Sequence, residues 1–353
     1  VDSSKFYKSP RWSGEITDCS MPLTLDTYSN CSYNCAYCFS GFQRALGARG
    51  KNYKDKVAFC VDVEHVKSMF KDPDAYAGQF AWYIKNRHVV QWGGLSDAFD
   101  EYERENGASL ELLTLFREIN YPISISTKAT WFLKDKRYTD VISGYRNSHW
   151  KISVITASVE AARKVERGAP SPAERLAALE TLRTLNVGAT TLRFRPFIIG
   201  LSEKSAKQLI ESAANSGAYS VSLEFLCVES RAVNVLRSRF ADITDVIGFD
   251  IVGYYKRNSQ RKSGLLRLNY DIKRPFVDMV KALCDESGLK LFVSDAHHKE
   301  KSHACACCGL PPPGETDTEL CNYYTGHFSH ALQIAKRNGR VAWKDIQHLA
   351  ASM

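Results

Sequence analysis

The feature that most constrains the fold is a repeated alternation of short β-branched runs with longer amphipathic stretches. Strands that alternate with helices form βα units, and the strands of such units lie parallel in one sheet. The sequence therefore predicts an α/β fold. The parallel strands are expected at Leu23–Thr27, Val89–Trp92, Ile123–Thr127, Ile152–Ala157, Thr190–Phe197, Ser220–Leu226 and Leu289–Val293.

The clearest helical stretch is Pro172–Asn186. Ser171 before it can act as N-cap, and Pro172 suits the first turn because its missing N–H would have no partner there. Leucines recur at helical spacing and predict one buried face, formed by Leu176, Leu179, Leu182 and Leu185.

Three cysteines follow the first predicted strand. Cys31, Cys35 and Cys38 stand in the stretch CSYNCAYCF with the spacing C-x3-C-x2-C. A closed [4Fe–4S] cluster takes four cysteine ligands. Three thiolates would leave one iron open to a chelating ligand, which turns an electron store into a reaction site. A zinc knuckle and a disulfide loop are the alternatives, although zinc sites usually present paired cysteine hooks and four ligands.

Cysteine usage in the whole chain also favours metal binding. The count of 11 is odd, and seven of the cysteines fall into two groups, which indicates ligation in a reducing compartment over a disulfide framework. With 44% apolar and 24% charged residues, and no run of 18 uncharged apolar residues, we expect a cytoplasmic protein without a membrane partner. The scattered cysteines are expected in the core: Cys19, Cys60, Cys227 and Cys284.

Further motifs follow the cysteines at the ends of later predicted strands. They read GGLSDAFDEYE, STK, VERGAPSPAERLAALETL and RPFIIGL, and with CSYNCAYCF they extend from about Pro22 to Ser202. This stretch resembles the radical S-adenosylmethionine (SAM) superfamily, in its DNA repair photolyase-like branch related to spore photoproduct lyase. The resemblance implies a partial (β/α)6 parallel barrel at residues 19–293. A lead-in at residues 1–18 and a Cys/His-rich module at residues 294–353 are expected to flank it.

The resemblance also implies how SAM is held. Its amino and carboxylate groups take the open iron, and Gly93 and Gly94 match the motif that receives the amino group. Lys128, after Ser126 at the end of a strand, is placed to pair with the SAM carboxylate. A tight turn is the alternative for the glycines, and a solubilising charge is the alternative for Lys128.

Other candidates lie on the next strands. Ser158 and Arg193 are expected to contact the cofactor, whereas Arg195 and Glu224 join Lys128 as candidate catalytic residues. Arg193 and Arg195 are alternate residues of one strand and so face the same side. The alternative for both arginines is a structural ion pair with a neighbour such as Glu224.

One departure from the branch concerns the substrate. Spore photoproduct lyases carry a cysteine in the segment that matches GGLSD, where it returns a hydrogen atom to the product radical. Gly94 stands there in this chain. A thymine-dimer lyase activity is therefore not expected.

A second group of cysteines lies near the C-terminus, with His303 and His327 beside it. Its thiols could hold a second [4Fe–4S] cluster or a zinc ion, or stay unligated. Because the group follows the last predicted strand, we expect its loop to fold over the barrel mouth. The members of this C-terminal cysteine group are Cys305, Cys307, Cys308 and Cys321.

These observations predict a radical SAM enzyme, of the lyase, transferase or oxidoreductase type. It would cleave SAM to a 5′-deoxyadenosyl radical that abstracts a hydrogen atom, with an electron donor such as flavodoxin or ferredoxin. A net charge of +8 and a patch of cations among tyrosines favour a nucleic-acid base or nucleotide as substrate. The alternatives are modification of a peptide or small metabolite with an auxiliary cluster, and a non-catalytic metal-binding nucleic-acid module. The cations of this patch are Lys256, Arg257, Arg261, Lys262 and Arg267.

Overall fold

A computed structural model describes residues 11–12, 19–40, 58–76, 79–229, 238–262, 264–304, 306–323 and 339. Most of the lead-in at residues 1–18 lies outside these ranges. So do Cys305, His327 and nearly all of the chain after residue 323. Among the described residues, no helix has the length and apolar character needed to cross a membrane.

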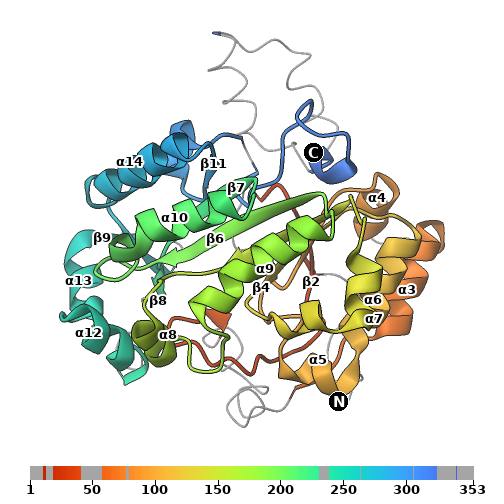
Figure 1. Ribbon diagram of the computed structural model, residues 1–353, viewed down its shortest axis with the longest axis horizontal. Coiled ribbons are helices and arrows are strands. Elements are labelled where there is room, and N and C mark those ends of the chain that lie inside the picture. Colours follow the sequence, from red (N-terminus) through yellow and green to blue (C-terminus); the bar gives the residue numbers. More distant parts are fainter. Residues whose placement is uncertain are drawn as a thin grey trace.

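One eight-stranded sheet forms the centre of the molecule (Figure 1). Its order is β1-β2-β3-β4-β5-β6-β7-β11, and all neighbours are parallel except the antiparallel pair β1 and β2. The described edge strands do not pair with each other, so the sheet is an open, partial barrel. The strands are β1 (Arg11–Trp12), β2 (Leu23–Leu25), β3 (Val90–Trp92), β4 (Ile123–Thr127), β5 (Ser148–Ser153), β6 (Ala189–Phe197), β7 (Ser220–Phe225) and β11 (Lys290–Val293).

The prediction of a parallel α/β sheet is confirmed, with one strand misplaced. β5 begins at Ser148 and ends at Ser153, whereas the apolar run predicted a strand at Ile152–Ala157. The apolar pattern missed the beginning of β5 because His149 and Lys151, which face the inner side of the sheet, interrupt that pattern. The sheet has seven parallel strands, as many as the sequence predicted, whereas the family resemblance implied a barrel of six βα units.

Helices cover the outer face of this sheet. Figure 1 shows α9 and α10 running along β6, with α3, α6 and α7 at the right of the view, past β4. The helices are α3 (Val63–Lys71), α4 (Gln79–Lys85), α5 (Glu101–Asn106), α6 (Ala108–Glu118), α7 (Lys136–Ile142), α8 (Val159–Val165), α9 (Pro172–Thr184), α10 (Ala206–Asn215), α12 (Ala241–Ile247), α13 (Ile251–Asn258) and α14 (Tyr270–Glu286).

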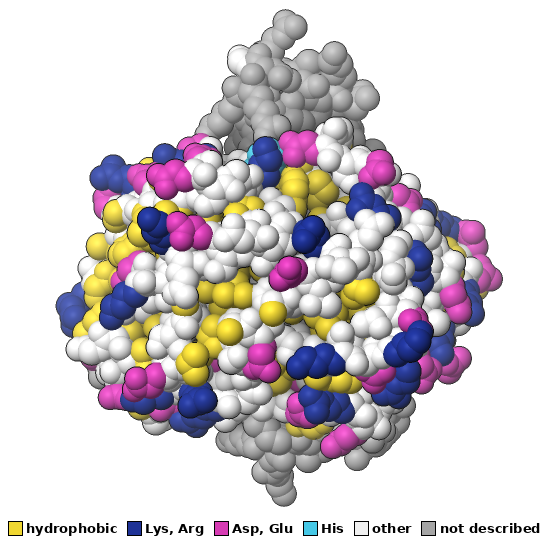
Figure 2. Space-filling view, in the orientation of Figure 1, with side chains coloured by type: hydrophobic (Ala, Val, Ile, Leu, Met, Phe, Trp, Pro, Cys, Tyr) yellow, Lys and Arg dark blue, Asp and Glu magenta, His cyan; other side chains and the backbone are white. Residues whose placement is uncertain are grey.

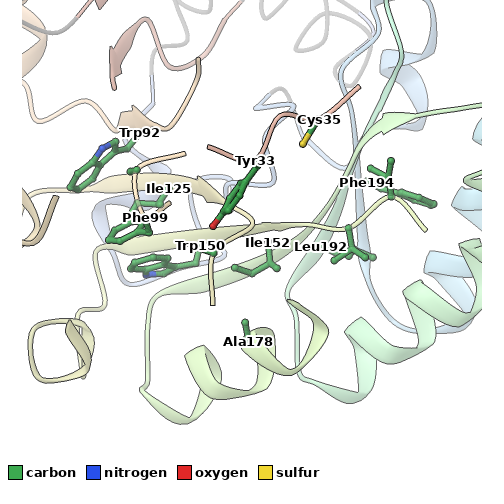
Figure 3. Packing of buried hydrophobic residues seen from close by; sticks show 14 of the residues in the cluster. Tyr33, Cys35, Trp92, Phe99, Ile125, Trp150, Ile152, Ala178, Leu192 and Phe194 are labelled. Carbon is green, nitrogen blue, oxygen red and sulfur yellow. The ribbon is translucent and has the colours of Figure 1, made fainter. Parts of the chain in front are cut away.

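The two faces of the sheet differ in chemistry although both are buried. Outward residues are apolar and pack beneath the helices, as Figure 3 shows for Ile152, Leu192 and Ala178 of α9. The residues between them are polar: Ser124 and Ser126 on β4, for example, are at most 4% exposed. Strands buried on both faces are usually continuously apolar. The alternation here indicates a polar lumen on the inner face.

Helix α9 confirms the predicted N-terminus. Ser171 accepts from the Glu174 N–H, and the Glu174 carboxylate accepts from the Ser171 N–H, which completes a capping box. Leu179 and Leu182 of the predicted stripe are buried, whereas Leu176 and Leu185 are only partly buried. Arg175 occupies the buried face instead.

A smaller antiparallel sheet lies beyond the carboxyl end of β7, in the order β8-β10-β9. Figure 1 shows it beside α12 and α13. Its strands are β8 (Val228–Glu229), β9 (Ser259–Lys262) and β10 (Leu265–Leu268).

The segment 306–323 packs against the amino ends of the parallel strands. The Ser220 hydroxyl donates to the Gly309 carbonyl at 3.4 Å, and the Val89 N–H donates to the Asn322 carbonyl at 3.1 Å. Ser220 begins β7, and Val89 directly precedes β3. The expectation that this segment covers the barrel mouth is therefore wrong, because its backbone binds the opposite end of the sheet.

Candidate active site

The cysteine trio lies on the loop after β2, at the carboxyl end of the sheet, as predicted. The Cys38 N–H donates to the Cys35 carbonyl at 3.1 Å and closes a turn between the second and third cysteines. Cys35 is buried, whereas Cys31 and Cys38 are partly exposed. Figure 3 shows Tyr33 and Cys35 on the side of the strands opposite Ala178 of α9.

A buried ion pair from the β5–α9 connection frames this loop. The Tyr37 hydroxyl donates to the Glu166 carboxylate, and Arg175 Nη2 binds the other oxygen of Glu166 at 2.6 Å. Both charged side chains are fully buried. Arg175 also donates to the Ser153 carbonyl at 2.7 Å, so the pair joins the loop to β5.

Backbone contacts add to this frame. The Ala36 N–H donates to the Val165 carbonyl at 2.8 Å, and the Gly168 N–H donates to the Tyr33 carbonyl at 3.1 Å. A Cβ at Gly168 would lie 3.0 Å from the Tyr33 Cα. The loop thus needs a glycine at this point of approach.

Buried carboxylates from the GGLSDAFDEYE motif hold the other side of the loop. Asp100 accepts from the Ser32 N–H at 2.6 Å and caps α5. Asp97 accepts from the Thr127 hydroxyl and from the Lys128 N–H, each at 2.7 Å. Burial raises the pKa of Asp100 to about 7. These carboxylates serve as hydrogen-bond acceptors that fix backbone.

Lys128 lies beside the cysteine loop, with Nζ 5.6 Å from the centre of the Tyr37 ring. Burial alone would lower the pKa of Lys128, but the nearby Cys35 and Glu166 raise it. Burial raises the pKa of Cys35 to about 11, although Lys128 opposes that rise. The ammonium therefore favours the thiolate form, which is the form that binds iron.

The other two thiols differ in environment. Burial, together with Asp100 and Asp97, raises the pKa of Cys31 well above its ordinary value. Burial also acts on Cys38, but a hydrogen bond with Ser40 and nearby cations outweigh it and lower its pKa. Because a metal requires thiolates, binding at this trio releases protons.

The trio fits three corners of a cubane cluster. Its three sulfur donors stand on one short loop that is braced from both sides. Among the described residues, no group of three or more His, Cys, Asp or Glu side chains is arranged to hold a metal ion. Cysteine thiolates are nonetheless the donors that an iron–sulfur cluster takes.

Gly93, one of the two predicted glycines, has a structural role. Gly93 has a φ of +80°, and a Cβ there would lie 2.5 Å from the Ser126 carbonyl oxygen. Only glycine allows this approach of two strand ends. The Ser126 hydroxyl is buried and has no hydrogen-bond partner among the residues that the structure describes. Ser158 is the N-cap of α8, accepting from the Ala161 N–H at 3.2 Å.

The polar side chains of the lumen come in layers, two residues apart on each strand. In the lower layer, nearest the amino ends, His149 contacts Ser124 at 2.8 Å and Thr191 at 2.7 Å, and Thr191 contacts Ser220 at 2.7 Å. The lower layer is Ser124, His149, Thr191 and Ser220. The middle layer is Ser126, Lys151, Arg193 and Ser222.

At the top of the lumen, Arg195 pairs with Glu224. Its Nε lies 2.7 Å from the carboxylate, and its Nη2 contacts Glu224 and the Ser294 hydroxyl as well. Arg195 thus makes the ion pair with Glu224 that the alternative anticipated, and a catalytic role for the two residues stays a prediction. Arg193 contacts only the Ser153 hydroxyl, at 3.4 Å, among the interactions described for it.

Two of the C-terminal cysteines, Cys307 and Cys308, lie at the lumen beside Arg195. Cys307 and Cys308 are buried, and Cys308 Sγ lies 3.7 Å from Arg195 Nη1. A hydrogen bond from Cys307 lowers the pKa of Cys308 well below its ordinary value, and Lys151 and Arg195 add to that effect. Cys321 donates to the Thr318 carbonyl at 3.4 Å. Cys305 lies outside the described residues.

The predicted patch of cations among tyrosines is exposed at its cations but not at all of its tyrosines. Lys256, Arg257 and Arg261 are exposed, but Tyr255 is fully buried and donates to the Leu226 carbonyl at 2.7 Å. Figure 2 shows cations and carboxylates mixed over the face in view. An open groove of about 880 Å³ adjoins the cysteine loop at Tyr33, and its walls also carry both charges, including Arg104, Lys134, Glu101 and Glu174.

The sequence pattern does not single out Lys151, Glu166 or Arg175. The VERGAPSPAER stretch contains the last two, but its pattern indicates only a family motif and the start of a helix. Lys151 fell outside the predicted strand. Its alternation with His149 and Ser153 would have placed it on one face of a longer strand.

Comparison with solved structures identifies the fold. A mutant of spore photoproduct lyase matches with a TM-score of 0.58 at 12% identity, over 82% of this chain and 79% of the other. Spore photoproduct lyase complexed with dinucleoside spore photoproduct matches with a TM-score of 0.57 at 12% identity, over 78% and 76%. A radical SAM methyltransferase from Kitasatospora setae, TsrM, gives a TM-score of 0.48 at 8% identity, over 90% and 61%.

Neither a family model nor a curated protein sequence matches this chain. The structural likeness is therefore one of architecture at low sequence identity. It extends over about four fifths of both chains in the first match. This chain has the fold of spore photoproduct lyase.

Proposed function

We propose that this chain is a radical SAM enzyme. The observation that carries the proposal is the cysteine trio, framed by Glu166 and Arg175 and placed beside Lys128 at the carboxyl end of the parallel sheet. Cys31, Cys35 and Cys38 would hold a [4Fe–4S] cluster. When both are bound, the cluster and SAM supply radical chemistry that abstracts a hydrogen atom from the substrate.

The protein itself would position SAM and shield the reacting carbon from water. Gly93, Gly94 and Ser126 would contact SAM, and Lys128 would provide the cation for the SAM carboxylate. Arg193 on β6 and Ser158 at the start of α8 are further candidates for contact with SAM. The lumen beneath the loop would exclude water from the reacting carbon. An electron donor such as flavodoxin or ferredoxin would reduce the cluster.

For the substrate we favour a nucleic-acid base or nucleotide. The support is the shared fold with a lyase solved with a dinucleoside and the exposed cations Lys256, Arg257 and Arg261. Gly94 in place of a cysteine argues against thymine-dimer repair itself. The second candidate is a small metabolite or peptide, favoured by the buried thiols Cys307 and Cys308 at the floor of the lumen, which would hold an auxiliary cluster or zinc.

Anaerobic reconstitution tests the proposal. We expect the reduced protein to cleave SAM and release 5′-deoxyadenosine. Cys35→Ala should abolish release, because it removes a cluster corner, whereas Cys284→Ala, a buried thiol on α14, should retain it. Undiminished release from Cys35→Ala would refute the ligand assignment. Bound zinc without SAM cleavage in the wild-type protein would support the non-catalytic nucleic-acid module.

A further inference from the structure

The middle layer of the lumen is a set of donors without acceptors. Ser126 Oγ, Lys151 Nζ and Ser222 Oγ are buried, and none has a hydrogen-bond partner within the described parts of the chain. Ser126, Lys151 and Ser222 are 4%, 1% and 0% exposed. An unpaired buried ammonium is unfavourable, because it has lost its hydration without gaining a partner. Such a group persists where a ligand supplies the missing partner.

These side chains lie side by side across four strands. Ser126 on β4 is in register with Lys151 on β5, and Arg193 on β6 is in register with Ser222 on β7. Lys151 is in register with Thr191, two residues before Arg193, so Lys151 and Arg193 are diagonal neighbours. Two cations and two hydroxyls therefore form one continuous row.

The charges of the lumen leave an excess of cations. Arg195 is paired with Glu224, whereas no ion pair is found for Lys151 or Arg193 in the described residues. Even if Cys308 is a thiolate, three cations face two anions: Lys151, Arg193 and Arg195 against Glu224 and Cys308. At least one positive charge remains for a ligand to neutralise.

We propose that the middle layer binds the oxyanion head group, a carboxylate or a phosphate monoester, of a small substrate. An oxyanion offers several acceptor oxygens to an ammonium, a guanidinium and two hydroxyls. This inference deepens the proposed function, since it places the substrate of that enzyme in the lumen beneath the cysteine loop.

Because the middle layer lies deep in the lumen, only a group at the end of a ligand can reach it. Gly309 closes the floor just below, where an added Cβ would lie 2.5 Å from Thr191 Oγ1 and 2.8 Å from Ser220 Oγ. A ligand cannot continue past the middle layer in that direction. The end of a small molecule can reach Lys151, whereas an internal phosphodiester of a nucleic-acid strand cannot.

Thermal unfolding and equilibrium binding of the reconstituted protein test this site, with inorganic phosphate and acetate as probes against chloride of equal ionic strength. A probe that binds the folded state raises the Tm. We expect phosphate or acetate to do so. Lys151→Met should weaken binding of that probe at least tenfold and raise the Tm of the probe-free protein, because it removes an unpaired charge. Ser222→Ala should weaken binding about tenfold, because it removes one hydrogen bond to a charged group.

The matched control is Lys207→Met, an exposed lysine on α10, which should bind the probe like the wild type. The better probe identifies the head group as phosphate or carboxylate. Absence of a Tm shift with both probes, or wild-type binding by Lys151→Met, would overturn the site. So would displacement of the probe by a single-stranded oligonucleotide without terminal phosphates.

SAM measurements on the same preparations separate this inference from the proposed function. Loss of SAM affinity in Lys151→Met equal to its loss of probe affinity would assign the layer to the SAM carboxylate and overturn the inference. SAM cleavage by a wild-type protein that binds neither probe would refute the oxyanion site alone. Probe binding without SAM cleavage would refute the enzyme proposal and leave the site in place.

Discussion

The lower and middle layers of the lumen are separated by two residues on each of four strands, yet they have opposite character. In the lower layer, His149 and three hydroxyls form an unbroken chain of hydrogen bonds, all neutral because burial lowers the pKa of His149 well below its ordinary value. In the middle layer, the hydroxyls and the ammonium have no hydrogen-bond partner in the part of the chain that the structure describes. A satisfied layer needs nothing from outside, whereas an unsatisfied charged layer is prepared for a ligand.

A carboxylate introduced into each layer gives the largest contrast. Ser220→Asp places a charge among neutral groups, and we expect it to lower the free energy of unfolding by about 3 kcal/mol. Ser222→Asp places the same charge beside Lys151 and Arg193, and we expect stability unchanged or raised by about 1 kcal/mol. Urea denaturation of both variants measures the difference. Equal losses would show that the two layers do not differ in charge.

The pH dependence of stability sharpens the description of the lower layer. Native His149 stays neutral while the unfolded chain takes up a proton below about pH 6.5. We therefore expect the free energy of unfolding to fall as the pH is lowered from 7 to 5. The His149 contribution is at most about 1.4 kcal/mol per pH unit.

His149→Gln isolates that contribution, since it keeps hydrogen-bonding capacity without a titrating ring. Its stability should fall less over the same pH range than that of the wild type, measured by urea denaturation at each pH. Parallel curves for the two proteins would mean that His149 does not hold a lowered pKa in the folded state.

Two serine truncations on β4 give the smallest effect. Ser124→Ala removes a hydrogen bond to His149, and we expect a loss of about 1 kcal/mol. Ser126→Ala removes a hydroxyl without a described partner, and we expect a change within about 0.5 kcal/mol in the absence of a ligand. Thermal unfolding of the pair checks this order, and a greater loss for Ser126→Ala would contradict it.

The sequence predicted the positions of the strands better than it predicted the polar side chains that line the lumen. Strand runs such as Ile123–Thr127 carry a β-branched pattern that is read locally, and β4 has those bounds. Lys151 was missed because a cation in a buried strand violates the apolar pattern that locates strands. Such violations are where function is expected.

The two cysteine groups show the same limit. The spacing of Cys31, Cys35 and Cys38 identifies them as a motif, and the predicted strand directly before them places that motif at the carboxyl end of the sheet. Both signals are local in the sequence. The position of Cys307 and Cys308 depends on where a long C-terminal segment returns to the sheet. Nothing in their own neighbourhood encodes this return to the amino ends of the strands.

The ion pair that frames the cysteine loop has a consequence for biosynthesis. Tyr37 and its acceptor Glu166 are 129 residues apart in the chain, and Arg175 follows later still. A ribosome adds about 5–20 residues per second, so the thiols emerge several seconds before their brace exists. Iron delivered to the nascent chain would encounter the three cysteines before Glu166 and Arg175 hold their loop in place. Iron delivered after release would encounter the folded loop.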